Sequence, residues 1–107
     1  MKIIAYLGGG RGKAVLLSLI SSKLCPELVF IKSTCNSDNI KEVCKLNHIY
    51  IEEIKGQFSA KHIDVISEEK PDIFIVSGFN LILPSNLLKI AKYGGINCHA
   101  GRLPEYR

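Results

Sequence analysis

Two side chains near the end of the chain have types and spacing that could do chemistry together, Asn97 and His99. One residue separates them, so on a β-strand their side chains point to the same face. An amide can donate a hydrogen bond to an oxygen that becomes negative, and an imidazole beside it can move or stabilise a proton. The pair therefore predicts acyl transfer. By itself, however, an Asn-x-His sequence more often marks the capped end of a strand and a loop histidine whose hydrogen bonds are all made within the protein.

A glycine-rich stretch, residues 8–13, is the second candidate site. It lies between an expected strand and an expected helix, where bare backbone N–H groups can hold an anion. Its spacing matches neither the phosphate loop nor the dinucleotide pattern, which needs glycine where Lys13 stands. Two interpretations stay open. Either Gly9, Gly10 and Arg11, with Lys13 as the alternative to Arg11, bind a phosphate or another polar group of a substrate, or the stretch is a tight turn that needs several residues with positive φ.

The composition excludes several classes of protein. The 107 residues, 47% of them apolar, make one domain with a core. No apolar run reaches the 18 or so residues of a membrane span, and the N-terminus lacks the pattern of a signal peptide, so we expect a cytoplasmic protein without membrane contact. The net charge of +4 comes from scattered Lys and Arg. We therefore expect no nucleic-acid partner, although the positive bias would help to recruit an anionic substrate such as a nucleotide.

The cysteines and histidines indicate neither disulfides nor a metal site. No two cysteines form a C-x-x-C pair, and no histidine falls at ligand spacing to a cysteine, so we expect free thiols and no metal. The residues concerned are Cys25, Cys35, Cys44, Cys98, His48, His62 and His99.

Strand and helix patterns alternate along the chain. Apolar runs predict strands at residues 3–7, 28–31, 49–51, 72–78 and 95–99. Helical spacing and caps predict helices at residues 13–24, from Asn39 (with Glu42 as its capping partner), from Ser59 to about Lys70, and from Pro84 to Gly94. The expected fold class is α/β: a Rossmann-like, doubly wound, mostly parallel sheet with helices on both faces. In such a sheet Asn97 and His99 fall at the carboxyl end of a strand, where ligands bind.

Two longer segments resemble the folate-dependent formyltransferases. Residues 96–107, Ile-Asn-Cys-His-Ala-Gly-Arg-Leu-Pro-Glu-Tyr-Arg, look like that family's I-N-x-H-x-x-x-L-P-x-Y-R element. Residues 71–84 are similar to its segment of Pro-Asp, an apolar run and then aromatic-x-x-Ile-Leu. The spacing between the two segments is also that of the family. The chain is thus similar to the N-terminal part of a formyltransferase catalytic domain.

The resemblance implies roles for particular residues. Asn97 would hydrogen-bond the formyl carbonyl and steady the oxyanion, and His99 would act beside it as proton acceptor or electrostatic stabiliser. The formyl donor would be 10-formyltetrahydrofolate and the nucleophile a primary amine. The residues near the folate would be Phe79, Leu81, Ile82 and Leu83. Packing in the core is the competing interpretation of these four.

Two departures from the family pattern matter. The family's third catalytic residue is an Asp beyond the Leu-Pro element, and this chain stops at Arg107, so we expect an incomplete catalytic domain that is inactive by itself. Gly101 and Arg102 also stand where many members have Ser and Leu. This variant is similar to formyltransferases of nucleotide-linked amino sugars, which favours such a substrate over an initiator tRNA or a purine precursor. The nucleotide sugar would contact Arg102 and the glycine stretch.

Several alternatives stay open. The chain is also similar to methionyl-tRNA formyltransferase and to glycinamide ribonucleotide formyltransferase. A non-catalytic α/β ligand-binding fragment is the alternative from another class. A homodimer is compatible with the sequence.

Overall fold

The protein is described here by a computed structural model that covers residues 1–33 and 37–98. In these residues five strands form one sheet in the order β3-β2-β1-β4-β5, and every neighbouring pair is parallel. The strands are β1 (Ile3–Leu7), β2 (Leu28–Lys32), β3 (Tyr50–Ile54), β4 (Ile73–Ser77) and β5 (Gly95–Asn97). The helices are α1 (Gly9–Ser21), α2 (Asp38–Leu46), α3 (Ala60–Glu69) and α4 (Ser85–Leu88). The α/β prediction is confirmed.

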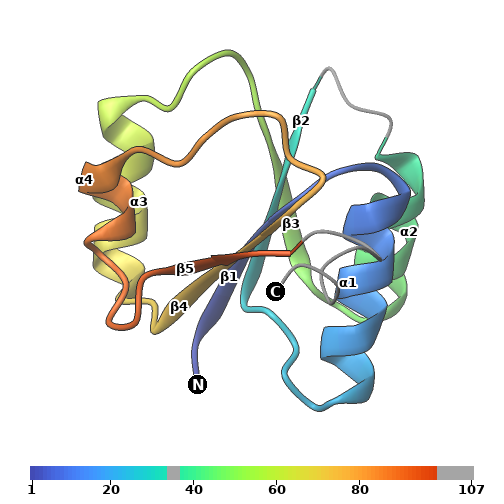
Figure 1. Ribbon diagram of the computed structural model, residues 1–107. Coiled ribbons are helices and arrows are strands. Elements are labelled where there is room, and N and C mark those ends of the chain that lie inside the picture. Colours follow the sequence, from blue (N-terminus) through green and yellow to red (C-terminus); the bar gives the residue numbers. More distant parts are fainter. Residues whose placement is uncertain (34–36, 99–107) are drawn as a thin grey trace, which may run out of the picture.

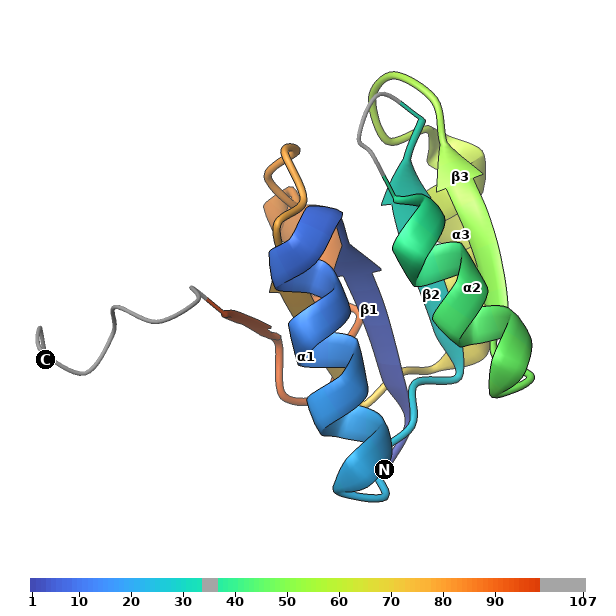
Figure 2. The same cartoon turned by 90° about the vertical axis from the view of Figure 1, so that its right-hand side faces the viewer.

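Helices cover both faces of the sheet. Figure 1 shows α1 and α2 on one side and α3 and α4 on the other, and Figure 2 shows α1 and α2 lying along the strands. Successive residues of β1 belong to the two different cores: Ala5 to the cluster under α1 and α2, and Tyr6 to the cluster under α3 and α4. All five residues of β1 are buried. Burial on both faces explains why the strands are continuous apolar runs rather than alternating patterns.

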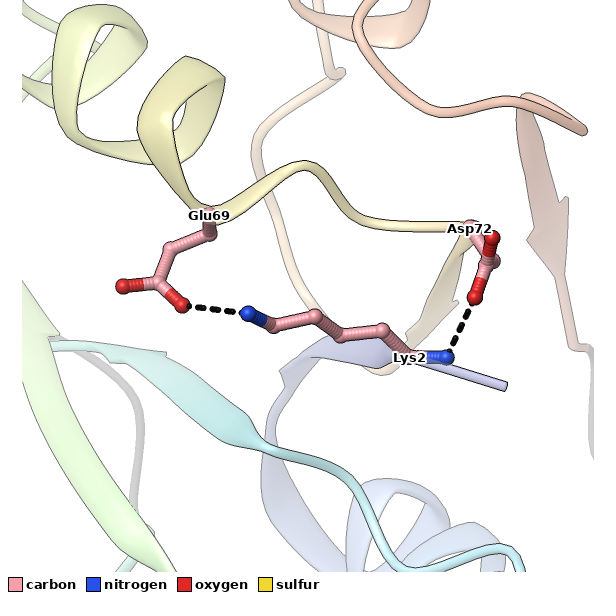
Figure 3. Close-up of polar contacts among 3 residues, drawn as sticks. All are labelled: Lys2, Glu69 and Asp72. Carbon is pink, nitrogen blue, oxygen red and sulfur yellow. Dashed lines mark hydrogen bonds and ion pairs between the residues drawn. The ribbon is translucent and has the colours of Figure 1, made fainter.

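Charged side chains fix the amino ends of the central strands. The Lys2 ammonium lies 2.9 Å from the Glu69 carboxylate at the end of α3, and the Lys2 backbone N–H donates to the Asp72 carboxylate at 2.6 Å (Figure 3). The Asp72 N–H donates in turn to the Lys2 carbonyl at 2.8 Å. These contacts bring the starts of β1 and β4 together, in the register that pairs Ile3 with Ile73. The two carboxyl ends then also lie side by side.

The glycine stretch is the first turn of a helix. The Gly12 N–H donates to the Gly8 carbonyl at 2.9 Å, so α1 begins at Gly9, four residues earlier than predicted. Only Gly9 in this stretch has positive φ, at 60°. The interpretation as a tight turn with several positive-φ residues was therefore wrong. At its other end α1 stops at Ser21, before Lys23 with φ of 62°, rather than at residue 24.

The predicted helix caps have mixed outcomes. Ser59 caps α3, because its hydroxyl accepts from the His62 N–H at 3.1 Å. The capping pair of Asn39 and Glu42 was wrong: α2 begins at Asp38, so Asn39 already lies inside the helix.

The last predicted helix, residues 84–94, is shortened to the single turn of α4. After α4 the N–H groups of Lys92 and Tyr93 donate to the carbonyls of Pro71 and Asp72, at 3.2 and 2.8 Å. These bonds draw the chain to the start of β4, which a continuing helix would not permit.

Candidate functional site

Asn97 lies at the last paired position of β5, opposite Val76 of β4. Its residue is exposed, and it contributes to the wall of a cavity of about 400 Å³. Val76 and Asn97 of this lining lie near the carboxyl ends of β4 and β5, the side of the sheet where open α/β sheets bind ligands. The predicted location of Asn97 at the carboxyl end of a strand is thus found in the fold.

The rest of this cavity is mostly apolar. The residues that line it come from β4, from the segment between β4 and α4, and from α4 and β5: Val76, Phe79, Asn80, Leu81, Ile82, Leu83, Leu88, Gly95, Ile96 and Asn97. All four residues predicted near the folate are among them. The structure therefore brings Phe79, Leu81, Ile82 and Leu83 together with Asn97.

The four residues differ in how much of each side chain is buried in the core. Leu83 is only 6% exposed and packs with Leu87 in the cluster under α3 and α4, so core packing accounts for most of its side chain. Phe79 packs edge-on against Tyr6, with ring centroids 5.4 Å apart. Ile82 is 92% exposed at the cavity. A large apolar side chain that the fold leaves in water beside a cavity is available for contact with a ligand.

The segment between β4 and α4, residues 78–84, is called the cavity segment, and it begins where two glycines approach each other closely. Gly78 has φ of 67°, and a Cβ at this position would collide with the Gly8 carbonyl oxygen. The Gly8 N–H donates to the Ser77 carbonyl at 3.0 Å, which joins the ends of β1 and β4. Sequence reasoning read Gly78 only as the end of a strand. The available signal was a glycine placed directly before the aromatic residue of the cavity segment.

The predicted substrate-binding residues of the glycine stretch lie elsewhere. Gly9 and Gly10 form the N-terminus of α1, and Arg11 contributes to a different cavity of about 520 Å³ between α1 and β5. That cavity includes Cys98 and not Asn97. Arg11 is therefore not brought into the cavity that Asn97 lines. His99 and Arg102 lie outside the described residues.

An aromatic cluster adjoins the Asn97 cavity through Phe79, which belongs to both. The Tyr6 hydroxyl and His62 Nε2 share a hydrogen bond of 2.7 Å, and the Phe58 and Phe79 rings stack with centroids 6.3 Å apart. Burial lowers the pKa of His62, which favours the neutral imidazole. His62 also lines a third cavity of about 250 Å³. No local pattern singles out this histidine, because its tyrosine partner is 56 residues away.

Other candidate chemistry is sparse within residues 1–33 and 37–98. Cys25, Cys44 and Cys98 are free, and burial raises the pKa of Cys44 to about 11 and also raises that of Cys98. Among these same residues, no group of three potential ligands from His, Cys, Asp and Glu could hold a metal ion. None of the helices described is long and apolar enough to cross a membrane.

Comparison with known proteins connects this geometry to a family. The sequence pattern of the formyl transferase family matches residues 9–107. Methionyl-tRNA formyltransferase of Dictyoglomus thermophilum is 43% identical over 56 residues, which are 52% of this chain and 17% of that protein. The same enzyme of Caldicellulosiruptor saccharolyticus is 39% identical over 62 residues (58% and 19%), and that of Lactiplantibacillus plantarum is 30% identical over 76 residues (71% and 24%). The chain therefore spans only about a fifth of the length of these relatives.

Proposed function

The chain belongs to the formyl transferase family, and on that premise we propose that the whole protein transfers a formyl group from 10-formyltetrahydrofolate to a primary amine. The observation that carries the proposal is the common cavity of Asn97 and residues 79–83. Those residues come from the two segments that resemble the family's own elements.

The residues of the cavity fit a reduced folate. Its volume of about 400 Å³ is within the range of about 300–1,000 Å³ that small-molecule sites occupy. Leu81 and Ile82 would contact the flat ring system, whose apolar faces suit aliphatic side chains. Backbone groups of residues 79–83 would pair with the polar edge of the ring. The bound donor would supply the formyl group.

Asn97 would act on the oxygen of that formyl group. A neutral amide can donate a hydrogen bond to an oxygen that gains negative charge as an amine attacks the carbonyl carbon, and such a donor is worth most when it is held in place beforehand. We propose His99 as the group that accepts or stabilises a proton beside it. The family's further acidic residue would belong to a part of the whole protein beyond Arg107.

We propose the methionyl group of a methionyl-tRNA as the acceptor amine. The three relatives described above all bear the name of that activity, and the net charge of +4 is compatible with a polyanionic partner even without a basic cluster. This acceptor replaces the nucleotide-linked amino sugar that the sequence motif favoured, and it departs from the expectation of no nucleic-acid partner. The amino sugar stays as the second candidate because of Gly101 and Arg102. Either acceptor would be met in the cytoplasm.

The test is formylation by the whole protein. With 10-formyltetrahydrofolate as donor, we expect formyl-methionyl-tRNA to form faster than any N-formylated nucleotide amino sugar. The Asn97→Ala variant should lose about 10²–10³-fold in kcat, the usual loss on removing one oxyanion donor. The matched control is Asn86→Ala, which changes an exposed asparagine of α4 that is not among the cavity residues. Near-normal turnover by Asn97→Ala, or equal losses in both variants, would contradict the proposal.

A further inference from the structure

Asn97 lies at the end of a short strand. β5 has three residues, all exposed, and it pairs within the described sheet only with β4. Asn97 is in the last of its three pairs. Strand ends with few buried contacts open most readily, whereas a group that stabilises a developing charge must be held in position. The hydrogen bonds just past the last pair of the ladder therefore bear on where the Asn97 amide points.

Two hydrogen bonds join Cys98 to the last two residues of β4, and one of them comes from the Ser77 side chain. The Ser77 hydroxyl donates to the Cys98 carbonyl at 3.0 Å, and the Cys98 N–H donates to the Val76 carbonyl at 2.7 Å. Both backbone groups of Cys98 are thus bonded to β4, immediately after Asn97. The Cys98 carbonyl also belongs to the peptide unit that leads into His99.

Ser77 itself is rigidly placed. Its residue is 0% exposed, and its own carbonyl accepts from the Gly8 N–H at the end of β1. A buried serine in an otherwise apolar strand requires a partner for its hydroxyl, and here that partner is the backbone beside Asn97. Through Ser77, the end of β1 is linked to the end of β5.

We propose that Ser77 is a positioning residue for Asn97. It does not touch the reacting atoms. Its hydroxyl extends the attachment of β5 to β4 by one residue past the ladder and so fixes the direction in which the Asn97 amide enters the cavity. This inference rests on the proposed formyl transfer, because it assigns Ser77 a part in that same site.

The first test separates the hydroxyl of Ser77 from its bulk. In the whole protein, Ser77→Ala should lower kcat about tenfold, corresponding to one hydrogen bond, with little change in KM for the formyl donor. Ser77→Thr keeps the hydroxyl and should retain most of the turnover, while Ser77→Val has the same shape without the hydroxyl and should behave like Ser77→Ala. If the branched variants fail to fold, Ser77→Cys offers a side chain of similar size with a weaker donor and should give an intermediate kcat. The matched control is Ser21→Ala, which removes an exposed hydroxyl that also donates to a carbonyl, that of Ser18.

A double-mutant cycle then tests whether Ser77 acts through Asn97. Adding Ser77→Ala to Asn97→Ala should lower kcat no further, because the group being positioned is already absent. Backbone amide exchange at Asn97 and Cys98 should be faster in Ser77→Ala, while exchange in β1 stays slow. Normal kcat in Ser77→Ala, equal activity of the threonine and valine variants, or additive losses in the cycle would overturn the inference while the wild-type protein still transfers formyl groups. An inactive wild-type protein would instead refute the proposed function and this inference with it.

Discussion

Replacing Gly78 by alanine should destabilise the protein by about 2–3 kcal/mol, because this glycine packs against the backbone of Gly8 at the end of β1. Its φ of 67° is in the left-handed region, where a residue with a Cβ is strained by about 1–2 kcal/mol. The added Cβ would also lie closer than 3.0 Å to the Gly8 carbonyl oxygen, a contact that real Cβ atoms do not make. The carbonyl must move, and it is the acceptor for the Gly12 N–H at the start of α1. Losing that bond adds about 1 kcal/mol.

Gly56 supplies the matched control for this prediction. Its φ is 71°, but a Cβ added there meets no atom within 4 Å. Gly56→Ala should therefore cost only the backbone strain of about 1–2 kcal/mol. Urea unfolding of the whole protein measures both values, and at a typical slope Gly78→Ala should lower the transition midpoint by about 1 M or more. If Gly78→Ala is no less stable than Gly56→Ala, the close approach of β1 and the cavity segment is wrong.

Two further predictions concern the cavity and the aromatic cluster that adjoins it. Ile82→Ser should weaken the binding of tetrahydrofolate, measured by calorimetry, about tenfold, and should change the free energy of unfolding by no more than about 0.5 kcal/mol. Leu46→Ser, at a leucine 74% exposed on α2, should change neither quantity. Equal binding by both variants would contradict the assignment of Ile82 to the folate site. Burial lowers the pKa of His62 in the folded state, so as the pH falls His62 is protonated in the unfolded chain before it is protonated in the folded protein. The free energy of unfolding should therefore have its full value above about pH 6.5 and should decline below it. His62→Gln should reduce this decline in urea titrations at pH 7.5 and 5.5, and an unchanged slope would show that the Tyr6 and His62 pair is not its source.

The alternation of strands and helices was readable from the sequence because it depends on local pattern. Residues 73–76 are all apolar, so apolar side chains point to both faces of the strand, as expected for a strand that is covered on both faces. The cap at Ser59 was equally local, a hydroxyl three residues from the N–H it accepts. The grouping of Asn97 with residues 79–83 followed from two segments whose order and spacing resemble a family. These features need no knowledge of distant contacts.

The features that sequence reasoning missed depend on partners far along the chain. The start of α1 at Gly9 follows from the meeting of Gly8 with Ser77, about 70 positions later. The short α4 follows from bonds back to Pro71 and Asp72, which outweigh the helical spacing of residues 84–94. The separation of Arg11 from Asn97 depends on which face of β5 each cavity uses. Local patterns carry no information about such contacts.

The most direct test of the account is a crystal structure of the whole protein with 5-formyltetrahydrofolate, a stable analogue of the donor. We predict that the ring system lies in the cavity lined by residues 79–83, with the Asn97 amide nitrogen within about 3 Å of the oxygen of the formyl group. A folate bound in the cavity between α1 and β5, or bound with Asn97 turned away from it, would contradict the account.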